Sequence, residues 1–137
     1  MDDFAIKTEL RIDWSEIDLF GHVNNLSIMK YAQASRIKLL DRVGLMQLQY
    51  DVKKGPILAS ISTQFRKALF YPGKVTVYSK VSVIKNTSFE IQHVIFDEQN
   101  EIAAQVKDII VYFDFTDNTK LSIPVDLREK LLKMERN

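Results

Sequence analysis

The chain has 137 residues, which suits one domain of common size with a buried core. Hydrophobic residues make up 46% of it and charged residues 27%, as in an ordinary globular protein. Because 19 Lys and Arg nearly balance 18 Asp and Glu, the composition gives no reason to expect nucleic acid as a partner. The chain has no cysteine, which excludes disulfides, thiolate chemistry and cysteine-ligated zinc.

Residues 1–12 carry acids and lack the basic and apolar segments of a secretory signal. No apolar run approaches the roughly 20 residues that span a bilayer. Glycine and proline do not cluster, and no linker, repeat or low-complexity segment interrupts the sequence. We therefore expect a single domain over residues 1–137, located in the cytoplasm and without a membrane as a partner.

Hydrophobic periodicity predicts a strand and then a helix in the first third of the chain. Residues 4–14 alternate as in a strand, and the residues on one side are Phe4, Ile6, Thr8, Leu10, Ile12 and Trp14. Residues 26–45 predict an amphipathic helix of about five turns, with Asn24 or Asn25 as its N-cap and Gly44 as its C-terminal stop. The inward positions of this helix, at spacings of three and four, are Ile28, Tyr31, Ala32, Ser35, Leu39 and Val43.

Four further strands are predicted at residues 56–65, 74–84, 89–96 and 102–115, and a short helix at 124–134. The alternation over residues 74–84 places Val75, Val77, Val81 and Val83 on one face. The short connections between the later strands imply antiparallel pairing. One long helix must then cover one face of an antiparallel sheet, which is an α+β architecture. The other face of the sheet would lie partly open, and a second subunit is one common way to cover it.

Taken one at a time, the polar residues of this chain have ordinary structural explanations. Asp18 precedes the helix and would complement its dipole, which is worth a few tenths to about 1 kcal/mol. Glu16 is expected to be solvated, and His22 to bond a nearby backbone group in a turn. His93 shares a strand face with two isoleucines and is expected to be a satisfied histidine of the sheet or of an interface.

Several classes of enzyme lose their usual signal in this sequence. There is no cysteine and no G-x-S-x-G motif for a hydrolase nucleophile, and there is neither a P-loop nor a G-x-G-x-x-G motif. The two histidines are 71 positions apart, with no acid at ligand spacing beside either. We therefore expect no metal and no redox cofactor.

The combination of Asp18, Gly21, His22, Asn24 and Asn25 within eight residues favours a functional site. These residues precede a largely apolar helix, whose free N–H groups point outward and favour negative charge. A carboxylate beside such donors can attack a carbonyl, or activate water to attack it, while the donors hold the carbonyl oxygen. The pattern predicts an acyl-transfer site that needs neither serine nor cysteine.

The stretch WSEIDLFGHVNNLSIMKYAQASRIKLLDRVGL resembles the hotdog-fold thioesterases of the 4-hydroxybenzoyl-CoA thioesterase family. The pattern is an acid, any residue, Asp, two residues, Gly-His-Val-Asn-Asn, and then an aromatic residue and an Arg in the helix. The residues that match it are Glu16, Asp18, Gly21, His22, Val23, Asn24, Asn25, Tyr31 and Arg36. A looser likeness in pattern and order covers nearly the whole chain.

That resemblance implies a hotdog fold, with a long central α-helix wrapped by a curved antiparallel β-sheet and a short C-terminal helix. It also implies a homodimer or homotetramer with active sites at the subunit interface. By family position, Asp18 is the catalytic carboxylate, as nucleophile or general base, while His22 and Asn25 help to shape the site. Backbone N–H groups near Asn25 would polarise the thioester carbonyl. Residues 26–40 contain no acid, with Gln33 where related sequences often have Glu, which leaves Asp18 as the sole catalytic acid.

The resemblance further implies where the substrate lies. By family position, the CoA arm approaches residues 65–74, and two serines of the preceding strand could face the thioester. The alternative for each basic residue is that it is an ordinary solvated side chain of the surface, without a role in binding. The candidate substrate-binding residues are Gly21, Tyr31, Ser60, Ser62, Arg66, Lys67, Lys85, Asn86 and Ser88.

The function implied is that of an acyl-CoA thioesterase, which hydrolyses an acyl-CoA thioester to a free acid and CoA. One alternative is an acyl-ACP thioesterase, which a basic patch around Arg66, Lys67 and Lys74 would favour because the carrier protein is acidic. The other is a non-catalytic acyl-thioester-binding module on the same fold. The sequence does not indicate which acyl group is carried.

Overall fold

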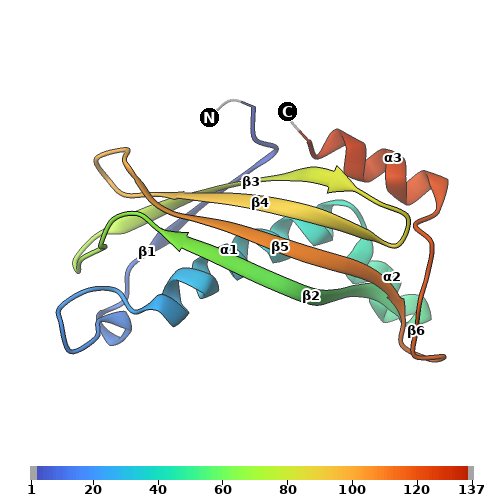
Figure 1. The fold of residues 1–137 in the computed structure, drawn as a ribbon, viewed down its shortest axis with the longest axis horizontal. Coiled ribbons are helices and arrows are strands. Elements are labelled where there is room, and N and C mark those ends of the chain that lie inside the picture. Colours follow the sequence, from blue (N-terminus) through green and yellow to red (C-terminus); the bar gives the residue numbers. More distant parts are fainter. Residues whose placement is uncertain (1–2, 136–137) are drawn as a thin grey trace.

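The computed structural model describes residues 3–135, which form a curled six-stranded antiparallel sheet with three α-helices. In chain order the elements are β1 (Ile6–Arg11), the 3-10 helix η1 (Trp14–Glu16), α1 (Asn25–Arg42), α2 (Leu45–Val52), β2 (Lys54–Phe65), β3 (Lys74–Ile84), β4 (Ser88–Phe96), β5 (Ile102–Asp114), β6 (Thr119–Lys120) and α3 (Val125–Lys133). The strand order is β1-β3-β4-β5-β2, and β6 pairs with β5. Helices α1 and α2 lie on one face of the sheet, behind the strands in Figure 1. The expected α+β class is confirmed, and the arrangement fits a hotdog fold.

Helix α1 packs against β1, β3, β4 and β5 through the face that its spacing predicted. All six predicted inward side chains are buried. Burying a side chain such as Leu39 stabilises the fold by roughly 1.5–3 kcal/mol. Asn24 is the N-cap, and Gly44, with a φ of +84°, ends the helix region one residue after the C-cap Val43, so both predicted ends are confirmed.

Two residues that the alternation placed on the apolar side of a strand do not lie on its buried side. Trp14 is 73% exposed, because β1 ends at Arg11 and the side chain of Asp13 caps η1 instead. Val83 is 43% exposed, because the register between β3 and β4 shifts after Val81. Such a bulge reverses the side-chain alternation beyond it. Periodicity also did not predict α2, which has eight residues, or β6, which has two.

The topology places two loops at one end of the sheet and a turn at the other. The loop between η1 and α1 lies at the left in Figure 1, beside the loop that joins β2 to β3. The turn between β3 and β4 lies at the right, beside α3. Within residues 3–135, no helix is both long enough and apolar enough to cross a membrane.

Candidate active site

Asp18 begins a tight turn that leads into α1. Its Oδ1 accepts hydrogen bonds from the N–H groups of Phe20 at 2.9 Å and of His22 at 3.3 Å. The Asp18 N–H donates to His22 O at 2.8 Å, and the Gly21 N–H donates to Asp18 O at 3.1 Å. Gly21 has a φ of +86°, which glycine adopts readily because it lacks a Cβ. The turn therefore holds one carboxylate oxygen, while Asp18 Oδ2 has no partner among the described residues.

The first turn of α1 leaves backbone donors unsatisfied. The N-cap residue Asn24 accepts the Ser27 N–H at its side-chain Oδ1, over 2.7 Å. The first N–H groups of a helix have no acceptor within the helix. The N–H groups of Asn25 and Leu26, at the start of the helix, also have no acceptor elsewhere within residues 3–135. Two free donors at the positive end of the helix dipole are suited to hold a developing oxyanion.

A cleft of about 370 Å³ joins these two features. The Val23 N–H donates to Leu69 O at 2.8 Å, which ties the Asp18 turn to the loop after β2. The His22 ring packs edge-on against Phe70, with ring centroids 5.1 Å apart. The residues that line the cleft are Asp18, His22, Val23, Asn25, Ile28, Phe65, Arg66, Lys67, Ala68 and Leu69. The Asp18 carboxylate and Asn25, the first residue of α1, thus share an open and largely apolar cleft, which can receive an acyl thioester.

Glu16 is 5% exposed, so the expectation that it is solvated is wrong. Its Oε1 accepts hydrogen bonds from the Asp13 N–H at 2.8 Å and the Tyr31 hydroxyl at 2.7 Å. Its Oε2 pairs with Lys30 Nζ at 2.7 Å. Burial would raise the pKa of Glu16, but the hydrogen bonds from Lys30, Tyr31 and Asp13 outweigh burial and hold the pKa below the ordinary 4.5. The local pattern did not indicate these contacts, because Tyr31 is 15 positions away in the chain.

Tyr31, a candidate for substrate binding, lies in the core with 3% of its surface exposed. Its hydroxyl donates to Glu16, and it is not among the residues that line the Asp18 cleft. Burial, and then the neighbouring Glu16 carboxylate, raise the pKa of Tyr31 well above its usual range. The phenol therefore stays protonated and acts as a hydrogen-bond donor.

Arg66 and Lys67 both line the cleft, but their charges are not equally available. Lys67 Nζ lies 2.7 Å from carboxylate oxygens of both Asp97 and Glu101, and these hydrogen bonds raise the pKa of Lys67. The Arg66 guanidinium instead donates to two neutral amides, Gln105 at 3.0 Å and Gln64 at 2.5 Å. Within residues 3–135 no carboxylate pairs with it. Arg66 therefore carries the uncompensated positive charge at this cleft.

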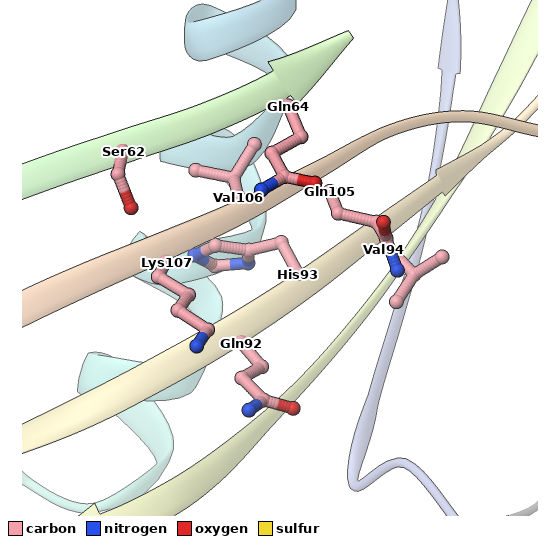
Figure 2. Close-up of a pocket in the computed structure, with 8 residues that line it drawn as sticks. All are labelled: Ser62, Gln64, Gln92, His93, Val94, Gln105, Val106 and Lys107. Carbon is pink, nitrogen blue, oxygen red and sulfur yellow. The ribbon is translucent and has the colours of Figure 1, made fainter. Parts of the chain in front are cut away.

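Ser60 and Ser62 lie on the outer face of β2, away from α1. Side chains alternate along a strand, and Ser62 pairs in register with the exposed Lys107. Figure 2 shows Ser62 and Lys107 at a separate hollow on this face, which Gln64, Gln92 and Gln105 also line. Within one chain, these serines are not brought to the Asp18 cleft.

Lys85 and Asn86, in the turn between β3 and β4, and Ser88, the first residue of β4, lie at the opposite end of the sheet from the Asp18 loop (Figure 1). The Lys85 N–H donates to Ser88 O at 2.7 Å, and Asn86 O accepts the Ile123 N–H at 2.8 Å. Lys85 and Ser88 line a small hollow of their own. A single chain therefore does not bring this turn and Asp18 together.

A group of polar residues buried between α1 and the sheet was not predicted as a unit. Its members are Ser35, Arg36, Ser79, His93 and Asp108. His93 has partners at both ring nitrogens, so the expectation of a satisfied histidine is confirmed. The available signal was the position of Ser79 and Asp108, which occupy inward positions of otherwise apolar alternating strands.

Comparison with known families matches residues 12–131 to the thioesterase-like superfamily. Among curated proteins, the chain is 20% identical over 130 residues to the long-chain acyl-CoA thioesterase FadM of Escherichia coli (strain K12). That alignment covers 94% of this chain and 98% of FadM.

Solved structures of thioesterases have the same fold. A predicted thioesterase from Bacillus stearothermophilus superposes with a TM-score of 0.85 and is 25% identical, covering 93% of this chain and 94% of its own. A thioesterase from Thermus thermophilus, complexed with coenzyme A and Zn, has a TM-score of 0.87 and is 19% identical, covering 98% and 97% of the two chains. The chain belongs to the thioesterase-like superfamily, and the expected class of enzyme, a thioester hydrolase, is confirmed.

Proposed function

We propose that the Asp18 cleft hydrolyses an acyl-CoA thioester to a free acid and CoA. The observation that supports this most is the arrangement of the carboxylate. Asp18 Oδ1 is held by the N–H groups of Phe20 and His22, Oδ2 has no partner within residues 3–135, and Asp18 and Asn25 line the same cleft. A carboxylate held in this way is preorganised for attack, because the turn fixes its orientation and occupies Oδ1, which favours reaction at Oδ2.

Two routes are open to the Asp18 carboxylate. As general base, Oδ2 takes a proton from water while the water oxygen bonds to the acyl carbon, the C–S bond breaks, and the thiolate leaves and is protonated. As nucleophile, Oδ2 itself bonds to the acyl carbon and expels the thiolate, and water then hydrolyses the mixed anhydride. In both routes negative charge develops on the carbonyl oxygen. The free N–H groups of Asn25 and Leu26 are suited to stabilise that charge.

The charge pattern at the cleft favours CoA as the thiol carrier. Of the two basic residues that line the cleft, only Arg66 lacks a carboxylate partner among the described residues. Lys74, the third cation of the expected basic patch, is not among the residues that line this cleft, so the cleft itself offers one available cation and not the broad patch that would suit an acidic carrier protein. A single guanidinium is sufficient to contact a phosphate of CoA. A structural relative from Thermus thermophilus was solved with coenzyme A.

The edge of the sheet at β2 supports the expected subunit interface. Within residues 3–135, β2 pairs only with β5, and its outer edge is free. A second copy, added antiparallel about a two-fold axis, would turn its β3–β4 end toward the Asp18 end of the first copy. Its Lys85, Asn86 and Ser88 would then lie at the same end of the joint sheet as Asp18. The three residues that a single chain keeps apart from the cleft would thereby approach it.

Release of free thiol from matched acyl-CoA and acyl-ACP substrates tests this function, using short, long and aromatic acyl groups. We expect turnover on at least one acyl-CoA and a lower kcat/KM on the corresponding acyl-ACP. A higher kcat/KM on acyl-ACP would assign the carrier protein as substrate. Ligand-induced stabilisation by acyl-CoA without release of thiol would contradict hydrolysis at this cleft.

A further inference from the structure

We propose that Glu16 is a positioning residue that sets the place of the Asp18 carboxylate by locking its turn onto α1. This inference rests on the proposed role of Asp18. Glu16 lies two residues before Asp18, is 5% exposed, and is not among the residues that line the cleft. It therefore cannot touch a substrate there, and any effect on the reaction must pass through the turn.

Glu16 holds both ends of the turn that carries Asp18. Its side chain bonds the Tyr31 hydroxyl and Lys30 Nζ, which fixes the start of the turn to the second turn of α1. Its backbone carbonyl accepts the Asn24 N–H at 2.9 Å, which fixes the end of the turn beside the N-cap of α1. An isolated antiparallel β-bridge pairs Ile17 with Val23, between these two attachment points. Glu16 thus links the Asp18 turn to α1 at two points, in addition to the bonds within the turn, and its side chain supplies the link at the start of the turn.

A carboxylate is suited to this role for two reasons. A buried carboxylate lowers the stability of the fold unless both of its oxygens have partners. Here Glu16 Oε1 accepts two hydrogen bonds and Oε2 forms an ion pair with Lys30. Bonds to an ionised acceptor are also stronger and more directional than neutral ones. The hydrogen bonds that lower the pKa of Glu16 keep it ionised at neutral pH. Displacing a reacting group by about 1 Å can cost on the order of 100-fold in rate.

A double-mutant cycle with Glu16→Ala and Asp18→Asn tests this role by separating a positioning effect from a general loss of structure. All proteins are assayed with one acyl-CoA well below their unfolding midpoints. We expect Glu16→Ala to lower kcat by about 10- to 100-fold with little change in KM, since the cleft wall is untouched. In the Asp18→Asn background the same substitution should cause no further loss, because Glu16 acts only through Asp18.

Glu9→Ala is the matched control, because Glu9 is a carboxylate on β1 whose side chain is 66% exposed. It should keep the wild-type kcat. Tyr31→Phe removes one of the three contacts made by the Glu16 carboxylate and keeps the buried ring. It therefore tests the same positioning role if Glu16→Ala does not fold. We expect Tyr31→Phe to lower kcat several-fold, by the same loss of orientation.

The outcomes separate this inference from the proposed function. If Asp18→Asn keeps wild-type turnover, the catalytic role of Asp18 fails and the role of Glu16 fails with it. If Asp18→Asn is inactive but Glu16→Ala keeps the wild-type kcat, only the role of Glu16 is overturned. Additive losses in the double variant would also overturn it, since Glu16 would then act independently of Asp18. A wild-type kcat in Tyr31→Phe, where Glu16→Ala does not fold, would overturn it as well.

Discussion

His93 Nε2 lies 2.6 Å from Asp108 Oδ2, at a point in the core where both side chains are fully buried. The same oxygen accepts a hydrogen bond from Arg36 Nη1 at 3.1 Å. On its other side, His93 Nδ1 lies 2.5 Å from Ser79 Oγ, which lies 2.5 Å from Ser35 Oγ. These contacts form a closed path, from Ser35 on α1 through one residue each of β3, β4 and β5 to Arg36, which is again on α1. These contacts fix the helix in one position along the sheet.

Asp108→Asn is expected to destabilise the protein by about 3–5 kcal/mol, because it leaves the Arg36 guanidinium buried without a counter-charge. Urea unfolding at neutral pH measures this loss. Replacing both partners, as Arg36→Met with Asp108→Asn, should recover part of the stability, because the uncompensated charge is gone. The exposed Asp41→Asn serves as control. A loss below about 1 kcal/mol for Asp108→Asn would show that the pair contributes little.

The dependence of stability on pH should report the bonds made by Glu16. Its pKa is lower in the folded protein than the ordinary 4.5, because its hydrogen bonds outweigh burial. The ionised form therefore stabilises the fold above about pH 4.5, and this contribution is lost as the pH falls through the lowered pKa. Glu16→Gln cannot titrate, so its Tm should fall less than that of the wild type between pH 6 and pH 3. Parallel Tm curves for the two proteins would contradict the ionised, hydrogen-bonded state of Glu16.

Arg66 and Lys67 should respond differently to substitution, although they are neighbours at the same cleft. Arg66→Ala removes an uncompensated charge, so we expect KM for acyl-CoA to rise by about fivefold to tenfold, with a smaller effect at high salt. Lys67→Ala should change KM little, because Asp97 and Glu101 already neutralise that ammonium. Acyl-pantetheine, which lacks the nucleotide phosphates, is the control substrate. An equal rise in KM for both substrates would contradict a phosphate contact at Arg66.

Local periodicity was sufficient to predict most of the fold. The buried face of α1 and the bounds of β3 follow from spacing within one element, because an amphipathic pattern is a local property. Trp14 was misassigned because the alternation continues past Arg11, although Asp13 begins a 3-10 helix there. The exposure of Val83 depends on a bulge, which no spacing within β3 reveals.

In the candidate site, too, features within one short segment could be predicted and contacts between distant segments could not. Asp18, His22 and Asn25 were recognisable because they lie within eight residues, and the fold brings all three to one cleft. The burial of Glu16 was not predictable, since it requires Tyr31 to face the turn across a tertiary contact. The contact between His93 and Asp108 is diagonal, because His93 pairs with Val106 and Asp108 pairs with Ile91, so it depends on the register between β4 and β5. Non-local pairing of this kind is absent from a single-sequence pattern.

The rate of thiol release by Asp18→Asn, compared with Asp41→Asn, tests the central claim most directly. Both substitutions remove one carboxylate charge near α1, but Asp41 is an exposed residue near the far end of the helix. We predict that Asp18→Asn lowers kcat by about 10²–10⁴-fold while its unfolding midpoint stays near that of the wild type, and that Asp41→Asn keeps full activity. A folded Asp18→Asn protein with near wild-type kcat would contradict the assignment of Asp18 as the reacting carboxylate.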